Sequence, residues 1–545
     1  MQDKQWELLS KIHPTDLDSL INELLRIRDI TKKTDKEMFL DPPKISSISL
    51  KDVGLDEKEF SKAYKRLTKA RKNKEKVIVY GDYDVDGVCS TAIMWETLYK
   101  NDFDALPFIP NRFRDGYGIS TDSIKSLHEQ HDNLGVIVTV DNGIVAHEAL
   151  KTAKKLGIDV IVTDHHQPDD KKLDAFCVLQ TDKLAGAGVS LIVSRELGTK
   201  FGKTIDDHVE LAAIGTVADQ VPLTEYNRAI VKQGLALVSK TSRSGLKALL
   251  ERSQVQGEVG TYDVGYRIGP RINAAGRLDD AMDALRLLCS SNNKSVEILA
   301  DILEKHNTRR RSIVDDVLQK STQNIGKKQS IVVVAGEDLH EGVIGLAASN
   351  LVETLYRPAI VLSIHGDVAK ASARSIQGFS IIDAIREVDD LILQGGGHEM
   401  AAGFSINVSN LEEFIQKINE NNKSKIDSLL TTPTTKVDIQ IDFELINWEM
   451  IEKIKELEPF GIGNPRPRFM TSDVVLSNIK TVGSEGGHLK CKVTSNGYSF
   501  DAIAFSKGYL FENFEEKQNV SILYSVDVNE WRGHTSIQLL IKDIQ

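Results

Sequence analysis

Three aspartates, Asp82, Asp84 and Asp86, stand at alternate positions directly after an apolar, β-branched run at 77–80. Such a run is typical of a strand that is buried on both faces of a parallel sheet. Carboxylates at the end of a strand converge on one point only when a positive charge lies there, so the pattern predicts a divalent metal site. An EF-hand loop is excluded, because its twelfth position, a glutamate, is Ile93 here. A solvated acidic turn stays open as the alternative.

Two further apolar runs, at 135–140 and 158–163, and a predicted helix at 210–218 also end in residues that can bind a metal. These residues are Asp141, Asp164, His165, His166 and Asp219. The carboxyl ends of parallel strands meet at one edge of a sheet, where ligands bind in open α/β folds. Carboxylate and imidazole ligands suit Mn²⁺ or Mg²⁺ better than thiolate-preferring metals. We expect Asp164 to fix its loop or a histidine rather than to bind metal.

The elements around these residues predict several domains in a chain of 545 residues. Strands alternate with helices from 77 to about 238, as in an α/β domain with a mostly parallel sheet. A second α/β unit is expected at 330–408, a polar linker at 423–435, and a small β-barrel beyond it. We expect the charged, helical N-terminal residues to pack on the first domain.

The composition excludes several classes of protein. With 41% hydrophobic and 27% charged residues, the chain is typical of a globular protein, and its net charge of −11 gives no overall basic field. The four cysteines form no C-x-x-C pair, which argues against a disulfide framework and favours a reducing compartment. No signal peptide and no apolar run of membrane-spanning length are present, so we expect a cytoplasmic protein without a membrane contact.

The acidic motifs carry a family resemblance. In order, D-Y-D-V-D-G, D-N-G, D-H-H and G-T-V-A-D resemble the DHH phosphoesterase superfamily. Within it, the chain is similar to the RecJ family of single-strand-specific exonucleases. The motifs that carry this similarity are I-P-N-R-F-R-D-G-Y-G (109–118), G-P-R-I-N-A-A-G-R (269–277), S-A-R-S-I (372–376) and G-G-G-H-E-M-A-A-G (395–403).

The resemblance implies the fold: two α/β domains, DHH and DHH-associated (DHHA1), joined by a long helix near 296–323 around a metal cleft, plus a C-terminal β-barrel of the OB-fold type. The expected divisions are a helical N-terminal segment (1–70), the DHH domain (71–240), a helical region with the connecting helix (241–325), the DHHA1 domain (326–425) and the OB-fold (436–545). The connection at 167–185 is shorter and more polar than the family leads us to expect, which bears on the wall of the substrate channel.

The implied activity is 5′-to-3′ hydrolysis of single-stranded DNA to nucleoside 5′-monophosphates with two ions of Mn²⁺ or Mg²⁺, in DNA recombination and repair. The implied metal ligands are Asp82, Asp84, Asp86, Asp141, His165 and Asp219. Asp141 is the expected bridge between the ions. His166 is expected to contact the scissile phosphate or assist proton transfer, and Asp141, His166 and Asp86 form the implied catalytic group.

The resemblance also implies contacts with the DNA. The implied phosphate-binding residues are Arg112, Arg271, Arg277, Ser372, Arg374 and His398. Phe460, Phe469 and Trp531 are candidates for stacking on bases, with the barrel core as the competing role. The expected partner is single-stranded DNA, a single-strand-binding protein or a helicase are candidate protein partners, and we expect a monomer.

Two other functions remain as alternatives. One is a DHH-family phosphodiesterase that acts on short oligonucleotides or cyclic dinucleotides. The other is a non-catalytic scaffold that binds single-stranded DNA. Comparing cleavage of a long strand with cleavage of a dinucleotide distinguishes the phosphodiesterase from the exonuclease. The metal content of the purified protein distinguishes the scaffold from the exonuclease.

Overall fold

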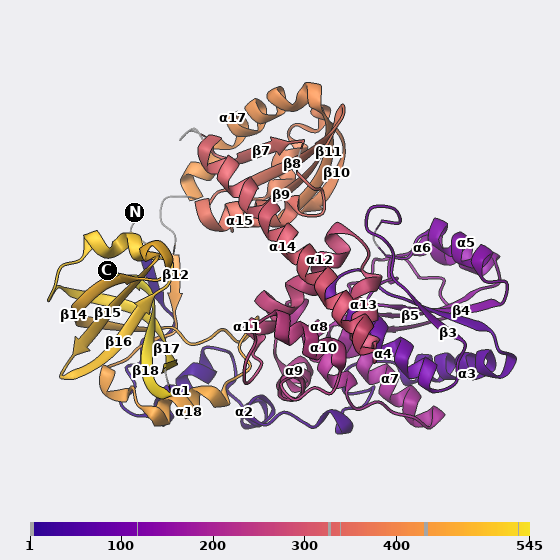
Figure 1. Ribbon diagram of the computed structural model, residues 1–545, viewed down its shortest axis with the longest axis horizontal. Coiled ribbons are helices and arrows are strands. Elements are labelled where there is room, and N and C mark those ends of the chain that lie inside the picture. Colours follow the sequence, from indigo (N-terminus) through magenta and orange to yellow (C-terminus); the bar gives the residue numbers. More distant parts are fainter. Residues whose placement is uncertain (1–4, 117, 325–328, 338, 430–433, 532) are drawn as a thin grey trace.

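The computed structural model describes residues 5–116, 118–324, 329–337, 339–429, 434–531 and 533–545, with the backbone alone at 320–324, 484 and 531. Figure 1 shows three bodies: an α/β domain, a second α/β domain above it, and a β-barrel to one side. Among the described residues, no helix is both long and apolar enough to cross a membrane.

The first α/β domain is built on a parallel sheet in the order β3-β2-β4-β5-β6. Its strands are β2 (Lys76–Tyr80), β3 (Ala105–Phe108), β4 (Leu134–Val140), β5 (Asp159–Asp164) and β6 (Cys177–Gln180), the last lying inside the short connection at 167–185. Alternate residues of β2 enter two different cores: Val77 and Val79 join one, and Ile78 and Tyr80 join the other. The sheet is therefore covered on both faces, which is why its strands are continuously apolar.

Helices pack on both faces of this sheet. Those of the larger core are α3 (Glu57–Asn73), α4 (Val85–Lys100), α7 (Gly186–Phe201) and α8 (His208–Ala218). Those of the smaller core are α5 (Thr121–Gln130) and α6 (His147–Lys155). The helices α4, α7 and α8 pack against one another. They carry or support the acidic residues singled out in the sequence.

A helical region follows and ends in the long helix α14 (Asn293–Asn324), close to the predicted span of 296–323. Its other helices are α9 (Glu225–Val238), α10 (Ser244–Arg252), α11 (Thr261–Asp263), the π-helical turn Val264–Ile268, α12 (Gly269–Leu278) and α13 (Met282–Cys289). In Figure 1, α14 runs from the first α/β domain up to the second. It therefore fixes how the two domains face each other.

The second α/β domain has a mixed sheet in the order β10-β11-β9-β8-β7. Its strands are β7 (Val332–Gly336), β8 (Ala359–His365), β9 (Val368–Arg374), β10 (Ile392–His398) and β11 (Ala401–Asn407), and its helices are α15 (Ile344–Leu355), α16 (Ile381–Arg386) and α17 (Leu411–Leu429). The linker predicted at 423–435 is wrong in its first half, because α17 continues to Leu429. Ile418 and Ile426 hold it there by packing into the core of the domain.

The C-terminal strands close into a five-stranded barrel, since β14 pairs with both β15 and β17. The strands are β14 (Phe469–Val482), β15 (His488–Ser495), β16 (Tyr498–Ala504), β17 (Asn519–Trp531) and β18 (His534–Ile544); β13 (Ile439–Gln440) pairs with β14, and α18 (Trp448–Glu456) lies beside the barrel. Phe460 and Phe469 are buried in its core, so neither is a base-stacking surface. The side chain of Trp531, the third candidate, lies outside the described residues.

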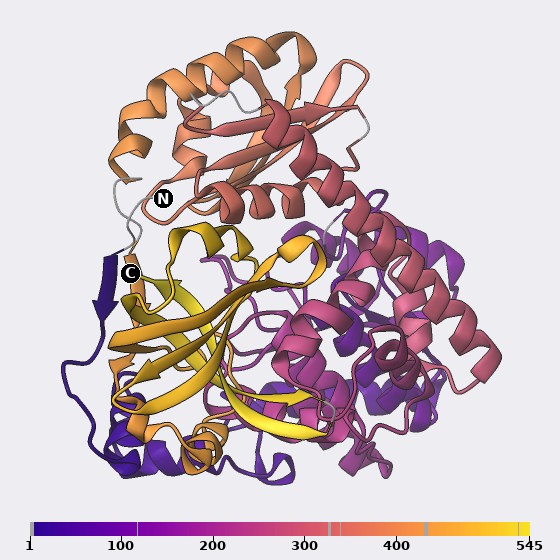
Figure 2. The ribbon, with the colours of Figure 1, turned by 60° about the vertical axis from the view of Figure 1, so that its left-hand side comes forward.

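Residues 5–40 pack mainly on the barrel, and not on the first domain as predicted, whereas residues 45–70 do pack on the first domain. Strand β1 (Gln5–Leu8) pairs with β12 (Thr434–Val437), and α1 (Leu17–Arg26) packs against α18. With α2 (Lys33–Leu40), α1 adds Leu20, Leu24, Leu25 and Phe39 to the core of the barrel. Contacts with the first domain begin at the end of α2, where the carbonyls of Phe39 and Leu40 accept from Arg228 and Lys232, and from residue 45 the chain enters the core of that domain. Figure 2 shows β1 and the first helices beside the barrel.

Candidate metal centre and phosphate pocket

The acidic residues meet at the carboxyl edge of the first sheet. Asp82 follows β2, Asp84 caps the N-terminus of α4 by accepting from the Gly87 amide at 2.9 Å, and Asp86 lies in the first turn of α4. Asp141 follows the neighbouring strand β4, and Asp219 caps the C-terminus of α8. Parallel strands and the helices that return from them thus deliver all five carboxylates to one edge.

His165 lies at the centre of these carboxylates. Its Nε2 atom is 3.1 Å from Asp141 Oδ1 and 3.6 Å from Asp219 Oδ2. Ligand atoms within 4.8 Å of one another form three overlapping groups: Asp82, Asp84 and Asp141; Asp86, His165 and Asp219; and Asp141, His165 and His166. Asp141 belongs to two of the groups, which is what a bridging ligand between two ions requires.

Three buried atoms in this cluster have no hydrogen-bond partner among the described residues: Asp141 Oδ1, His165 Nε2 and Asp219 Oδ2. A buried polar atom without a hydrogen bond is costly, and three such atoms at one point are typical of a site that binds a cation. The candidate ligand atoms are carboxylate oxygens and one imidazole nitrogen, and Mn²⁺ and Mg²⁺ prefer such ligands. The residues present therefore fit a divalent metal centre.

The acidity of the cluster agrees with this fit. Burial, followed by the charge of Asp84, raises the pKa of Asp82 and of Asp86 to about 7. Burial and the charge of Asp86 raise the pKa of Asp219 to about 7, and the same two causes raise the pKa of Asp141 well above its ordinary value. Buried like charges oppose each other's ionisation, and a cation would remove that repulsion.

His166 is held by Asp164, as the sequence predicts. Its Nδ1 atom is 2.7 Å from Asp164 Oδ1, and Asp164 also accepts from the amides of Ile144, His165 and His166. Burial opposes ionisation of Asp164, but the hydrogen bond and charge of His166 with these amides leave its pKa below the ordinary value. The hydrogen bond that His166 donates to Asp164 raises the pKa of His166 despite its burial. His166 is therefore held by Asp164 at the mouth of the site, where the cationic form of its ring is favoured.

Sequence reasoning missed the residues that hold Asp86 in place. The amides of Gly186 and Ala187, at the N-terminus of α7, donate to its carboxylate at 2.7 and 3.0 Å. A Cβ atom at Gly186 would lie 2.5 Å from Asp141 Oδ1, and one at Gly215 would lie 2.5 Å from Asp86 Oδ1. The only available signal was the A-G-A-G run at 185–188, whose small residues permit close approach.

A cationic pocket of about 320 Å³ lies between the two α/β domains. Its lining includes Arg112, Arg277, Ser372 and Arg374, four of the six predicted phosphate-binding residues, from three separate parts of the chain. Arg112 lies over the ring of Tyr83, at 5.4 Å, and Tyr83 stands between Asp82 and Asp84. The pocket therefore adjoins the acidic cluster, with positive charge set directly beside negative charge.

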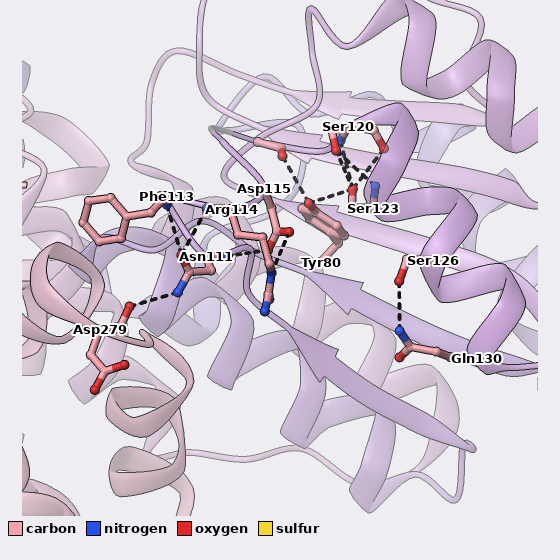
Figure 3. A network of polar contacts seen from close by, with 11 residues as sticks. Tyr80, Asn111, Phe113, Arg114, Asp115, Ser120, Ser123, Ser126, Gln130 and Asp279 are labelled. Atoms are coloured by element: carbon pink, nitrogen blue, oxygen red, sulfur yellow. Dashed lines mark hydrogen bonds and ion pairs between the residues drawn. The ribbon is translucent and has the colours of Figure 1, made fainter. Parts of the chain in front are cut away.

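The loop that carries Arg112 is anchored at both ends (Figure 3). Asn111 donates from its amide side chain to the Asp279 carbonyl at 3.1 Å, and accepts from the amides of Phe113 and Arg114. At the other end, the Tyr80 hydroxyl donates to the Gly118 carbonyl at 3.1 Å. These bonds tie the loop to the helical region and to the first domain, while Phe113 meets His340 of the second domain, edge to face at 5.3 Å.

Three family models match the chain. They are the DHH family N-terminal domain over residues 76–216, the DHHA1 domain over 328–424 and the RecJ OB domain over 437–543. The single-stranded-DNA-specific exonuclease RecJ of Bacillus subtilis (strain 168) is 34% identical, over 99% of this chain and 69% of that protein. The chain belongs to the RecJ family.

Solved RecJ structures have the same fold. RecJ of Thermus thermophilus in complex with Mn²⁺ matches with a TM-score of 0.83 and 28% identity, over 100% of this chain and 80% of that one. Its complex with Mg²⁺ matches with a TM-score of 0.76 and 27% identity, over 100% and 79%. The predicted fold class, two α/β domains around a metal cleft with an OB barrel, is confirmed.

Two of the six predicted phosphate-binding residues do not line the pocket. Arg271 is 5% exposed: its guanidinium pairs with Glu304 and donates to the carbonyls of Arg267 and Arg252. The predicted phosphate contact is therefore wrong for Arg271, whose donors serve helix packing. His398 is exposed at the end of β10, outside the pocket lining, two strands from Arg374.

The motif that contains Arg271 has another role at the metal centre. Asn273 accepts a hydrogen bond from the Val85 amide at 3.1 Å, at the start of α4. It thereby holds the turn that carries Asp84 and Asp86. The G-P-R-I-N-A-A-G-R segment thus positions the metal centre through Asn273, and lines the pocket through Arg277.

Proposed function

We propose that this protein is a metal-dependent exonuclease that degrades single-stranded DNA from its 5′ end, releasing nucleoside 5′-monophosphates, with Mn²⁺ or Mg²⁺ as cofactor. One observation carries the proposal: the cationic pocket adjoins a buried carboxylate cluster that fits divalent metal. The relatives named single-stranded-DNA-specific exonuclease RecJ, and the RecJ complexes with Mn²⁺ and Mg²⁺, support it.

The carboxylate cluster and His165 would hold two metal ions. The holding residues are Asp82, Asp84, Asp86, Asp141, His165 and Asp219. Bound there, the ions would supply activation of a water molecule and stabilisation of charge on the attacking and leaving oxygens. Asp141, shared between two of the ligand groups, would set the spacing of the pair.

The remaining side chains act on the DNA. His166, oriented by Asp164 through Nδ1, would donate from its other ring nitrogen to a phosphate oxygen. Arg112, Arg277 and Arg374 with Ser372 would grip the terminal 5′-phosphate, since guanidinium groups match phosphate oxygens in pairs. A grip on the 5′ end beside the metal centre would place the first phosphodiester bond at that centre, which sets the polarity.

The test is digestion of 5′-labelled and 3′-labelled single strands by the purified protein with Mn²⁺, beside the matching blunt duplex. We expect mononucleotides from the 5′ end of the single strand alone. Asp141→Ala should lower the rate of cleavage at least about a thousandfold. Asp390 is an exposed aspartate of the second domain, and Asp390→Ala should leave the rate unchanged.

Other outcomes would support the alternatives. An intact long strand beside a cleaved dinucleotide would indicate a phosphodiesterase of small substrates. Binding of single strands without cleavage of either would indicate a scaffold. A monomeric state, a cytoplasmic location and an interaction with single-strand-binding protein or a helicase stay predictions; sedimentation and pull-down with these candidates would test the first and the last.

A further inference from the structure

The segment between α18 and β14 docks on the first α/β domain. We call residues 457–464, L-E-P-F-G-I-G-N, the joint. Figure 1 shows the chain after α18 running from the barrel toward α11. The Leu223 amide of the first domain donates to the Ile462 carbonyl at 2.8 Å, and the Thr261 hydroxyl donates to the Phe460 carbonyl at 2.7 Å. The joint therefore connects the barrel to the domain that carries the acidic cluster.

Arg228, in the first turn of α9, donates hydrogen bonds to the joint. Its side chain is fully buried, at 0% exposure, and lies 3.7 Å from the centre of the Phe39 ring. The guanidinium donates to five backbone carbonyls, those of Phe39, Glu456, Leu457, Glu458 and Pro459, at 2.6 to 3.4 Å. Glu456 ends α18, so the cation lies where helix carbonyls have no partners of their own.

These contacts join three separate parts of the chain. Arg228 belongs to the first domain, Phe39 to the N-terminal segment that packs in the barrel core, and residues 456–459 to the end of α18 and the joint. None of the five hydrogen bonds ends on a carboxylate. All five of these acceptors come from the barrel side, so the docked barrel supplies the partners that the buried cation needs.

The joint also rests on the loop that leaves the metal centre. Asp219 caps α8, and the chain continues through Leu223 to α9, so one short loop carries both the candidate ligand and the contact to Ile462. The approach is close: a Cβ atom at Gly461 would lie 2.7 Å from Leu223 Cδ1. The contact between the barrel and the first domain therefore lies on the same short loop as Asp219.

We propose that Arg228 and the joint position the barrel so that a strand bound on it enters the metal cleft in register. The inference rests on the proposed exonuclease function and deepens it. Arg228 is a positioning residue, since its contacts in the described part of the chain are with the barrel side and not with the acidic cluster or the cationic pocket. A substrate long enough to span the barrel and the cleft depends on it, whereas a dinucleotide, which occupies the cleft alone, does not.

The first test compares Arg228→Lys with wild type on two substrates, a 5′-phosphorylated dinucleotide and a long oligothymidylate. Lysine keeps the charge but offers one ammonium in place of the planar fork, so it cannot serve five carbonyls at once. We expect kcat and KM for the dinucleotide within about twofold of wild type, KM for the long strand raised about tenfold, and fewer nucleotides released per binding event. Arg286→Lys, at an exposed arginine of α13, is the matched control and should change neither.

A second variant keeps the test independent of folding. Thr261→Val deletes the hydrogen bond to Phe460 at constant volume, and we expect a smaller shift in the same direction, about threefold in KM for the long strand. An equal loss of activity on the dinucleotide and on the long strand would overturn the inference. So would an unchanged KM for the long strand in folded variants of both Arg228 and Thr261. Failure of wild type to cleave either substrate would instead contradict the proposed exonuclease.

Discussion

Asp141 combines a left-handed backbone with a buried carboxylate. Its φ is +61°, a region that costs a residue with a side chain about 1 to 2 kcal/mol. The Asp141 amide donates to the Thr163 carbonyl of the neighbouring strand at 3.1 Å, which holds this conformation. The turn aims the carboxylate at His165 instead of continuing β4. Strain retained at such a point is consistent with the role of bridging ligand that we propose.

The raised pKa values in the cluster predict how metal removal alters stability. Asp82, Asp86 and Asp219 have pKa values of about 7 in the folded protein against 3.8 as the ordinary value. The unfolded chain releases these protons near its lower pKa while the folded chain keeps them, so the metal-free protein loses stability as pH rises toward 7. We expect Mn²⁺ to raise Tm more at about pH 8 than at about pH 5.5, measured against the chelated protein.

The control for this prediction is Asp219→Asn, which removes one of the buried acids. It should flatten the pH dependence of Tm in the chelated protein. An equal gain from Mn²⁺ at both pH values would contradict the assignment of these carboxylates as metal ligands.

Arg374 and Arg271 should respond differently to the same substitution. Arg374→Ala removes a donor from the cationic pocket, so we expect KM for a 5′-phosphorylated strand to rise about tenfold with little change in Tm. Arg271→Ala leaves Glu304 and two carbonyls without their partner, so we expect a loss of about 3 kcal/mol in the free energy of unfolding and an unchanged KM.

Digestion kinetics and urea denaturation of the two variants check this contrast. A strand without the 5′-phosphate is the control, because it should not distinguish Arg374→Ala from wild type. If Arg271→Ala raised KM and left the free energy of unfolding unchanged, Arg271 would contact DNA and would not serve helix packing.

At the scale of elements, two helix N-termini organise the centre. Asp84 caps α4, and the first amides of α7 hold Asp86. Free amides and the helix dipole favour negative charge there, so each helix stabilises the carboxylate at its N-terminus. Glycine at position 186 is required because Asp141 lies against it.

Gly186→Ala should therefore impair the metal centre specifically. The added Cβ atom would lie 2.5 Å from Asp141 Oδ1 and force that carboxylate aside. We expect kcat to fall about a hundredfold, with weaker Mn²⁺ binding by calorimetry. Gly188→Ala is the matched control on the same helix, where the new Cβ would meet Leu184 and Ile230 instead. Equal kcat in the two variants would contradict the proposed role of Asp141.

At the scale of the whole molecule, the two ends of the chain form one body. The N-terminal helices complete the core of the C-terminal barrel, and β1 pairs with β12. The chain then passes through the first domain, α14 and the second domain before it returns. The barrel is therefore tied to the first domain twice, by the segment near residue 45 and by the joint.

Leu24→Ala tests this arrangement. Leu24 is fully buried among the barrel residues, so its truncation should cost about 3 kcal/mol in the barrel's free energy of unfolding. We expect weaker binding of long strands and normal cleavage of a dinucleotide. Urea denaturation and the two-substrate assay measure both. Ile12→Ala, at an exposed position of the same segment, should be neutral; an unaltered Leu24→Ala would place the N-terminal segment outside the barrel core.

Local patterns determined much of this protein in advance. The apolar runs that end in Asp82, Asp141 and Asp164 predicted the parallel sheet and the edge where the candidate ligands meet, because strand burial and strand termination are properties of neighbouring residues. The barrel strands followed in the same way, whereas the long helix was implied by the family resemblance.

Other features were decided only by the tertiary structure. The burial of Arg271 against Glu304, the amides of α7 on Asp86, the docking of the N-terminal helices on the barrel and the five carbonyls around Arg228 all join residues far apart in the chain. No local pattern specifies which distant partner satisfies a buried donor or covers an apolar face. That choice is made by packing and hydrogen bonding in the whole molecule, where each buried group must find a partner that its neighbours in sequence do not supply.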